Sequence, residues 1–192
     1  MISEKLLLEG DGILRLRPTW VPRAFCRPGK RIKLHPDDYY CLGVEKGGID
    51  ERWLSSTTWA ENGPGTPAEE GLSRAVSADG TETVLLRDAV EELRGRLIGD
   101  GLWETYHRWP MFSKFFDNQG PLPHHIHHRD RHAARVGASG KPEMYFFPSQ
   151  LNPHGGEFPY TFFGLNPDCT REELRACLAG FEAGDNRILD HA

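Results

Sequence analysis

Glycine and proline recur along the whole chain and limit how far any helix or strand can run. The 192 residues include 21 glycines, 14 prolines and 10 phenylalanines. Glycine and proline occupy turns and end regular elements, whereas aromatic residues favour strands. We therefore expect short strands joined by turns, in one sizeable domain with or without an extension, and not a bundle of long helices.

The charge balance and the cysteines exclude several classes of protein. The net charge is −5, and no basic run is long enough to form a nucleic-acid surface. The first residues hold only three consecutive leucines between charges, too few for a signal peptide or a membrane span. No CxxC pair occurs, so no zinc knuckle, redox motif or disulfide framework is indicated by Cys26, Cys41, Cys169 and Cys177. We expect a cytoplasmic protein without a nucleic-acid or membrane partner; the sequence leaves its oligomeric state open.

The first half of the chain predicts short strands and one helix. The strands are predicted at residues 13–17, 31–34 and 84–86. Residues 87–98 place Val90, Leu93 and Leu97 at helical spacing. This spacing predicts an amphipathic helix that ends near Gly99.

The second half predicts a strand-rich region with one late helix. Four strands are predicted, at residues 111–118, 122–128, 143–148 and 159–165. For the helix, Asp168 or Thr170 serves as N-cap, Glu173 lies three residues after Thr170, and Gly180 closes it. Many short strands with turn signals between them indicate a mainly β sandwich or barrel with a few helices.

A cluster of histidines is the strongest functional signal. Five of the nine histidines lie between residues 124 and 132. On a strand, His125 and His127 share one face and lie roughly 6.6 Å apart, close enough for two imidazoles to bind one ion. His124 and His128 share the other face with Ile126 between them, and their spacing is too long for one ion. The alternative interpretation is a solvated, histidine-rich turn that binds nothing.

Glu143 opens the next predicted strand and supplies the carboxylate that often completes such a site. Neutral imidazole binds Zn, Fe, Ni and Mn ions, and a neighbouring carboxylate suits the same metals. We therefore predict a divalent-metal site made of His125, His127 and Glu143.

Around this site the chain resembles the class I mannose-6-phosphate isomerases. The motifs that carry the resemblance are KFFD at 114–117, HIH at 125–127, KPEM at 141–144, FGL at 163–165 and TREE at 170–173, with a weaker match in ERW at 51–53. Their order and rough spacing agree with the family across residues 110–180. The resemblance implies a cupin-type β-barrel, or jelly roll, and a zinc-dependent isomerase of sugar phosphates.

Carried over residue by residue, His127 and Glu143 match ligands of the family, and His125 stands where the family has glutamine. This change of ligand type also suits Fe, Mn or Ni in place of zinc. Lys141 matches a lysine that the family places beside the substrate in a catalytic role. The family's fourth ligand is a later histidine, and His191 comes too early in the pattern to match it. We therefore expect 1–192 to be a single cupin-like domain, incomplete at its C-terminal end, from a longer chain.

The expected function is that of a metal-dependent aldose–ketose isomerase acting on a small-molecule sugar or sugar phosphate. No glycine-rich phosphate cradle or arginine cluster can be located, so phosphorylation of the substrate stays open. Two alternatives use the same fold: a non-catalytic carbohydrate-binding or regulatory cupin, and an iron-dependent cupin oxygenase. Metal identity and activity without oxygen separate the isomerase from the oxygenase.

Several other residues have ordinary structural interpretations. Lys114 can be a surface lysine, and Lys141 has the same alternative to its catalytic role. Aromatic side chains are expected to pack in the core, among them Trp53, Trp59, Phe115 and Phe146.

Overall fold

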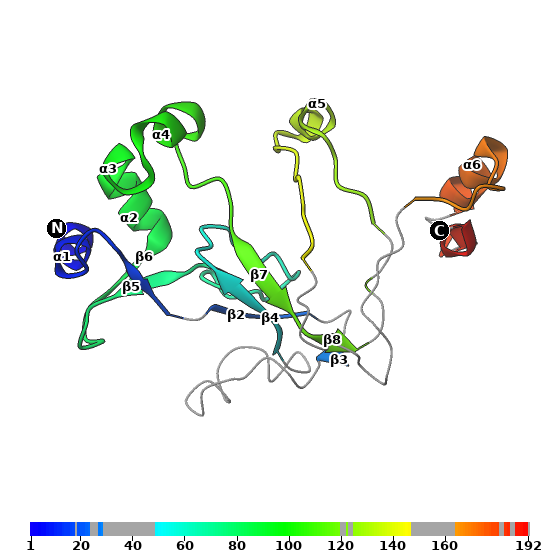
Figure 1. The fold of residues 1–192 in the computed structure, drawn as a ribbon. Helices are drawn as coiled ribbons and strands as arrows, with labels where there is room; N and C mark the ends of the chain where they lie inside the picture. Colours follow the sequence, from blue (N-terminus) through cyan, green and yellow to red (C-terminus); the bar gives the residue numbers. More distant parts are fainter. Residues whose placement is uncertain are drawn as a thin grey trace. The chain divides into compact units, whose positions relative to one another are not determined.

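The computed structural model describes residues 1–17, 19–23, 27–28, 49–119, 122, 125–146, 164–180, 183–184 and 187–191. The chain divides into two compact units, an N-terminal unit of Met1–Pro121 and a C-terminal unit of Leu122–Ala192. Figure 1 labels most of the helices and strands of both. The interpretation of residues 1–192 as one cupin-like domain stays a prediction.

The N-terminal unit combines helices with short antiparallel strands. Its elements, in chain order, are α1 (Ile2–Glu9), β1 (Arg15–Leu16), β2 (Thr19–Pro22), β3 (Arg27–Pro28), β4 (Ile49–Leu54), β5 (Arg74–Val76), β6 (Thr83–Leu85), α2 (Leu86–Leu93), α3 (Gly95–Ile98), α4 (Asp100–Tyr106), β7 (Ser113–Phe116) and β8 (Asn118–Gln119). The strands form three antiparallel sheets, in the orders β1-β5-β6, β2-β4-β7 and β3-β8.

Local sequence signals predicted several of these elements. The amphipathic helix at 87–98 is formed as α2 and α3, with a break at Arg94, whose φ of 52° lies in the left-handed region. Gly99 ends α3 with a φ of 87°, as the sequence predicted. The predicted strands at 13–17, 84–86 and 111–118 correspond to β1, β6 and the pair β7 and β8. The strand predicted at 31–34 lies outside the described residues.

One core of the N-terminal unit lies between α1, α2 and the β1-β5-β6 sheet. The apolar face of α2 buries Ala89, Val90 and Leu93, and α1 contributes Leu6. Ser3 on α1 donates a hydrogen bond to the Glu92 carboxylate at 2.7 Å, which joins the two helices. Burial of these side chains stabilises α1 and α2, which are too short to be stable alone.

A second core lies on one face of the β2-β4-β7 sheet. Val21, Trp53 and Ala60 are buried together, and the Phe112 ring stacks on Trp53 with centroids 4.6 Å apart. Gly71 passes so close that a Cβ there would lie 2.8 Å from the Trp53 ring. Any larger residue at this position would have to displace the indole or the backbone of the loop.

Of the four aromatic residues named above as core candidates, only one is buried. Trp53 is 3% exposed, which confirms it as a core residue. Trp59, Phe115 and Phe146 are 42%, 56% and 82% exposed, so their assignment to the core is wrong. For Phe115 the reason is strand parity, since it points to the opposite face of β7 from Lys114 and Phe116.

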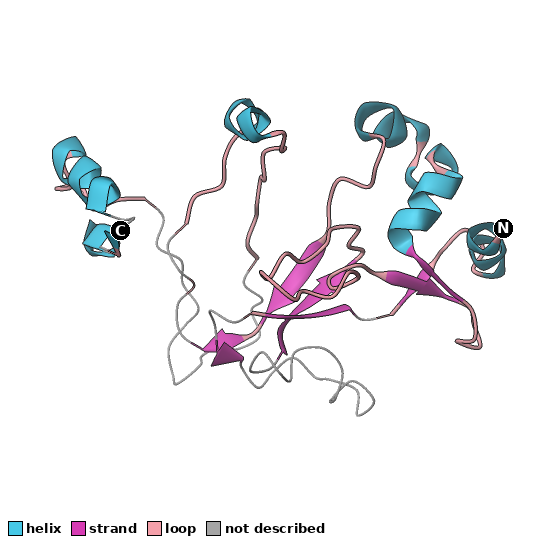
Figure 2. Cartoon of the chain, turned by 180° about the vertical axis from the view of Figure 1, so that it is seen from behind, coloured by secondary structure: helices cyan, strands magenta, loops and turns pink. Residues whose placement is uncertain are grey.

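The described part of the C-terminal unit contains helices and loops. Its elements are α5 (Asp130–Ala133), the 3-10 helix η3 (Ala134–Val136), α6 (Arg171–Gly180) and the 3-10 helix η5 (Arg187–His191), and Figure 2 distinguishes them from the strands of the N-terminal unit. The predicted capping box is confirmed. Glu173 N–H donates to Thr170 Oγ1 at 3.2 Å, and Thr170 N–H donates to Glu173 Oε2 at 2.8 Å.

The expectation of a strand-rich second half is confirmed at 111–118 and is wrong for the described residues after 119. Residues 122, 125–128 and 143–146 form no strand, and most of the segment predicted at 159–165 lies outside the described residues. A backbone hydrogen bond joins Lys141 N–H to His128 O, but the described residues build no ladder there. Antiparallel sheets are thus present, without a closed barrel among the residues described. Helical residues outnumber strand residues there, so the described part of the chain is not mainly β.

None of the helices in the described part of the chain is long and apolar enough to cross a membrane.

A buried carboxyl group lies on β4. Asp50 is 1% exposed, and its Oδ1 has no hydrogen-bond partner among the described residues. Burial, assisted by the neighbouring Glu51, raises the pKa of Asp50 from 3.8 to about 6. Between these two values the folded chain binds more protons than the unfolded chain, so stability falls as pH rises through this window.

We expect Asp50→Asn to stabilise the N-terminal unit by roughly 1–3 kcal/mol at about pH 8 and to have little effect at about pH 4. The amide has nearly the shape of the carboxyl group but carries no charge. Urea unfolding followed by tryptophan fluorescence measures this, because all five tryptophans precede residue 122. Equal pH dependence in the two proteins would show that Asp50 does not titrate in this range.

Candidate metal site

Three metal-binding side chains converge in the C-terminal unit. The ligand atoms of His125, His127 and Glu143 all lie within 4.8 Å of one another. These are the residues that the sequence predicted as ligands. Two imidazoles and one carboxylate form a donor set that suits Zn, Fe, Mn or Ni ions.

The two segments that carry these residues flank α5 and η3. Lys141 N–H donates to His128 O at 3.3 Å, and Gly140 N–H donates to Asp130 Oδ1 at 2.8 Å. A Cβ on Gly140 would lie 2.7 Å from Asp130 N and 3.0 Å from His128 O. Glycine therefore allows the returning segment to approach closely enough to bring Glu143 beside His127.

The geometry at His127 suits an imidazole that binds a cation. The His125 and His127 rings lie edge to face, with centroids 4.9 Å apart. His127 Nε2 lies 3.0 Å from Glu143 Oε2. This nitrogen is buried and has no partner in hydrogen-bond geometry among the described residues. A buried ring nitrogen without a hydrogen bond, beside a carboxylate oxygen, is the atom that a metal ion would satisfy.

The protonation of His127 agrees with this role. Burial lowers the pKa of His127 from its ordinary 6.5, and the positive charge of Lys141 lowers it further, against the opposing effect of Glu143. The imidazole is therefore neutral at pH 7, with a lone pair available for a metal. Protons therefore compete less with a metal for this nitrogen than they do for an unperturbed histidine.

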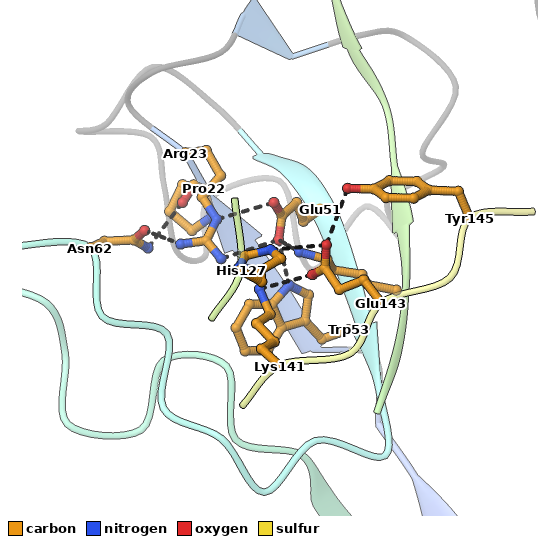
Figure 3. A network of polar contacts seen from close by, with 10 residues as sticks. Pro22, Arg23, Glu51, Trp53, Asn62, His127, Lys141, Glu143 and Tyr145 are labelled. Carbon is orange, nitrogen blue, oxygen red and sulfur yellow. Dashed lines mark hydrogen bonds and ion pairs between the residues drawn. The ribbon is translucent and has the colours of Figure 1, made fainter. Parts of the chain in front are cut away.

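Glu143 is held by two more side chains, as Figure 3 shows. Lys141 Nζ lies 2.9 Å from Oε1, and the Tyr145 hydroxyl donates to Oε2 at 3.3 Å. The Glu143 side chain is 21% exposed, whereas that of Lys141 is 51% exposed. Sequence reasoning missed Tyr145. The signal was the spacing of two residues from Glu143, which gives both side chains the same direction on an extended chain.

A shallow, open pocket adjoins the site. It has a volume of about 270 Å³, and His127, Lys141, Ile126 and Val136 lie among its lining residues. This volume is near the lower end of the range for small-molecule pockets, which starts at about 300 Å³. Lys141 thus forms an ion pair with the carboxylate of the candidate site and also lines the adjoining pocket.

The N-terminal unit contains a buried charged cluster that sequence reasoning did not identify. The Glu51 side chain, 2% exposed, lies 3.1 Å from Arg23 Nε and 3.6 Å from Lys114 Nζ, and it accepts a 2.6 Å hydrogen bond from Trp53 Nε1. Figure 3 draws the contacts of Arg23, Glu51 and Asn62. Asn62 accepts from Arg23 and donates to Pro22 O, and it also donates to Glu70.

Lys114 belongs to this cluster and is not the surface lysine considered as an interpretation. Its side chain is 17% exposed, and its Nζ lies 4.1 Å from the centre of the Phe116 ring. The pairing of β4 with β7 sets Lys114 opposite Trp53 and Phe116 opposite Glu51. This placement follows from the register between β4 and β7, and the sequence alone does not indicate that register.

The other described histidines of the sequence cluster lie outside the candidate site. His128 and His132 form their own edge-to-face pair, with centroids 6.2 Å apart. His191 is found with Cys169 and Glu173. His124 and His154 lie outside the described residues.

No protein-family model, curated protein or solved structure matches this chain.

Proposed function

We propose that the chain is a metal-dependent aldose–ketose isomerase of sugars or sugar phosphates, of the mannose-6-phosphate isomerase type. The observation that carries the proposal is the convergence of His125, His127 and Glu143 with Lys141 beside them. In this proposal the two histidines and Glu143 hold a divalent ion. The resemblance of the motifs favours zinc, and the three donors also suit Fe, Mn or Ni.

The fit of the residues to a metal rests on the donor set and on the buried Nε2 of His127, which lacks a hydrogen bond among the described residues. A bound divalent ion supplies Lewis-acid polarisation of substrate oxygens. Glu143 presents Oε2 toward His127 and Oε1 toward Lys141, so the same carboxylate contacts both the candidate ligand His127 and the candidate catalytic residue Lys141.

In this proposal Lys141 is the residue that interacts with the substrate oxygen on which charge develops. Isomerisation between aldose and ketose moves a proton between adjacent carbons and develops negative charge on a substrate oxygen. The Lys141 ammonium, half exposed at the pocket and oriented by Glu143, can donate a hydrogen bond or a proton to that oxygen. Its role is therefore to orient and protonate the substrate.

We propose further that the chain adopts a cupin-type jelly roll. In a cupin-type jelly roll, two layers of antiparallel strands enclose the site. The antiparallel β2-β4-β7 sheet, with ERW on its central strand, supports this assignment.

The test begins with the metal content of the purified full chain. We expect about one equivalent of zinc, iron, manganese or nickel at this site, lost in His127→Ala. Removal of a direct ligand should weaken metal binding by roughly 100-fold or more, since loss of an outer-shell partner alone costs about 10–100-fold. Elemental analysis and a metal-binding titration measure it.

His132→Ala is the matched control, because this exposed histidine lies outside the three converging ligands. It should retain the metal. Activity is then assayed by interconversion of aldoses and ketoses, phosphorylated and unphosphorylated, with and without oxygen. A chain that takes up no metal at these residues after reconstitution, or one that isomerises no sugar when loaded, would refute the proposal.

A further inference from the structure

A second group of metal-binding side chains lies at the start of α6. The ligand atoms of Cys169, Glu173 and His191 all lie within 4.8 Å of one another. Cys169 and His191 are half-buried, and Glu173 is exposed. Thiolate, imidazole and carboxylate are the three side-chain types that bind zinc in proteins.

The backbone holds this group together from two separate segments. Asn166 N–H donates to His191 O at 2.7 Å, and Asn166 Nδ2 donates to Asp190 O at 3.2 Å. Cys169 N–H in turn donates to Asn166 O at 2.9 Å. These bonds tie η5 to the turn that precedes α6, so the approach of His191 to Cys169 follows from the fold of the backbone.

Glu173 can serve this group while it caps the helix. Both contacts from Thr170, through its N–H and its hydroxyl, go to Oε2 of Glu173, at 2.8 Å and 2.7 Å. A carboxylate offers about four lone-pair positions on two oxygens. Oε1 therefore stays available as a ligand without disrupting the capping box.

We propose that Cys169, Glu173 and His191 form a second metal site, which binds Zn²⁺ and links η5 to α6. Binding exchanges the Cys169 S–H bond for a metal–sulfur bond and releases the proton to solvent. Three protein ligands leave the fourth tetrahedral position to water. A soft sulfur ligand selects zinc over Mg²⁺ and Ca²⁺. The site shares no residue with the His125 group and does not depend on the proposed isomerase activity.

Cobalt(II) is the probe, because a cobalt–thiolate bond gives a charge-transfer absorption band. Histidine and carboxylate ligands of cobalt do not give this band. Titrating the full chain with Co²⁺ should produce this band, and Zn²⁺ should remove it. Cys169→Ser should abolish the band, whereas Cys177→Ala should keep it, since Cys177 is outside the group. His127→Ala should also keep it, which separates this site from the first.

Variants of the other two ligands complete the test. His191→Ala and Glu173→Gln should each weaken cobalt binding in the band titration by roughly 100-fold or more, since each removes a direct ligand. Glutamine at this position can keep the capping box, so loss of binding in Glu173→Gln reflects the ligand and not the helix. Absence of the band in the wild-type chain, its persistence in Cys169→Ser, or unchanged affinity in His191→Ala would overturn the proposal.

Discussion

Replacing Lys141 with alanine is expected to lower the rate of the proposed isomerase reaction by about 10²–10⁴-fold and to leave binding of the proposed metal intact. The side chain lies at the wall of the pocket and 2.9 Å from Glu143, but it is not one of the three converging ligands. Its loss removes the group that would donate to the substrate oxygen and leaves two imidazoles and a carboxylate for the metal. Steady-state kinetics with metal content measured on the same samples check this.

Lys5→Ala provides a control matched for exposure and pairing. Its side chain is 54% exposed and pairs with Glu82 on the surface of the N-terminal unit, much as Lys141 pairs with Glu143. Its removal should leave turnover unchanged. If Lys141→Ala keeps the wild-type kcat/KM with its metal in place, Lys141 has no part in the mechanism.

Lys141→Arg separates orientation from proton donation. Arginine keeps a positive charge beside Glu143 but does not release its proton at accessible pH. Substantial activity in this variant would indicate that the charge orients the substrate. A rate as low as that of Lys141→Ala would indicate proton transfer by the lysine, since charge alone would then be insufficient.

The parts of the structure that local chemistry determines were the parts that the sequence predicted. The capping box of Thr170 and Glu173 satisfies backbone groups within one turn, and the spacing of Val90 and Leu93 defines the buried face of α2. Both signals act within a few residues, so they hold whatever surrounds them. Gly99 ended its helix for the same reason.

The candidate metal ligands were selected on a premise that the structure only partly supports. The parity argument assumed strands at 122–128 and 143–148, and the described residues there form none. His125 still lies beside His127, and Lys141 and Tyr145, each two residues from Glu143, both contact its carboxylate. Side chains that alternate along an extended segment do not require a ladder of backbone hydrogen bonds, so the grouping survives without the strand.

The buried cluster around Glu51 could not be predicted from local signals. Arg23 follows β2, and the pairing of β2 with β4 brings it to Glu51. Asn62, in the loop after β4, then accepts a hydrogen bond from Arg23. Register between strands far apart in sequence depends on the whole sheet. The motif at 51–53 indicated the strand but not the charges that surround it.

Glu51→Ala is expected to destabilise the N-terminal unit by about 3–5 kcal/mol, because it removes the buried carboxylate that two largely buried cations contact. Arg23 is 15% exposed and Lys114 is 17% exposed in this cluster, and the Trp53 indole N–H also donates to Glu51. Removing the carboxylate removes a hydrogen-bond acceptor from the second core as well as a negative charge. Urea unfolding followed by tryptophan fluorescence reports on this unit alone, since every tryptophan lies within it.

Glu69→Ala is the comparison that isolates burial as the cause. Glu69 pairs with Arg74, but its side chain is 52% exposed, and exposed pairs contribute about 0–1 kcal/mol. Glu51→Gln should fall between the two, because the amide oxygen can still accept from Trp53 while the charge is lost. Equal losses for Glu51→Ala and Glu69→Ala would show that the Glu51 cluster is solvated and does not stabilise the sheet. A loss confined to Glu51→Ala, with Glu51→Gln near wild type, would assign the stabilisation to the hydrogen bond and not to the ion pairs.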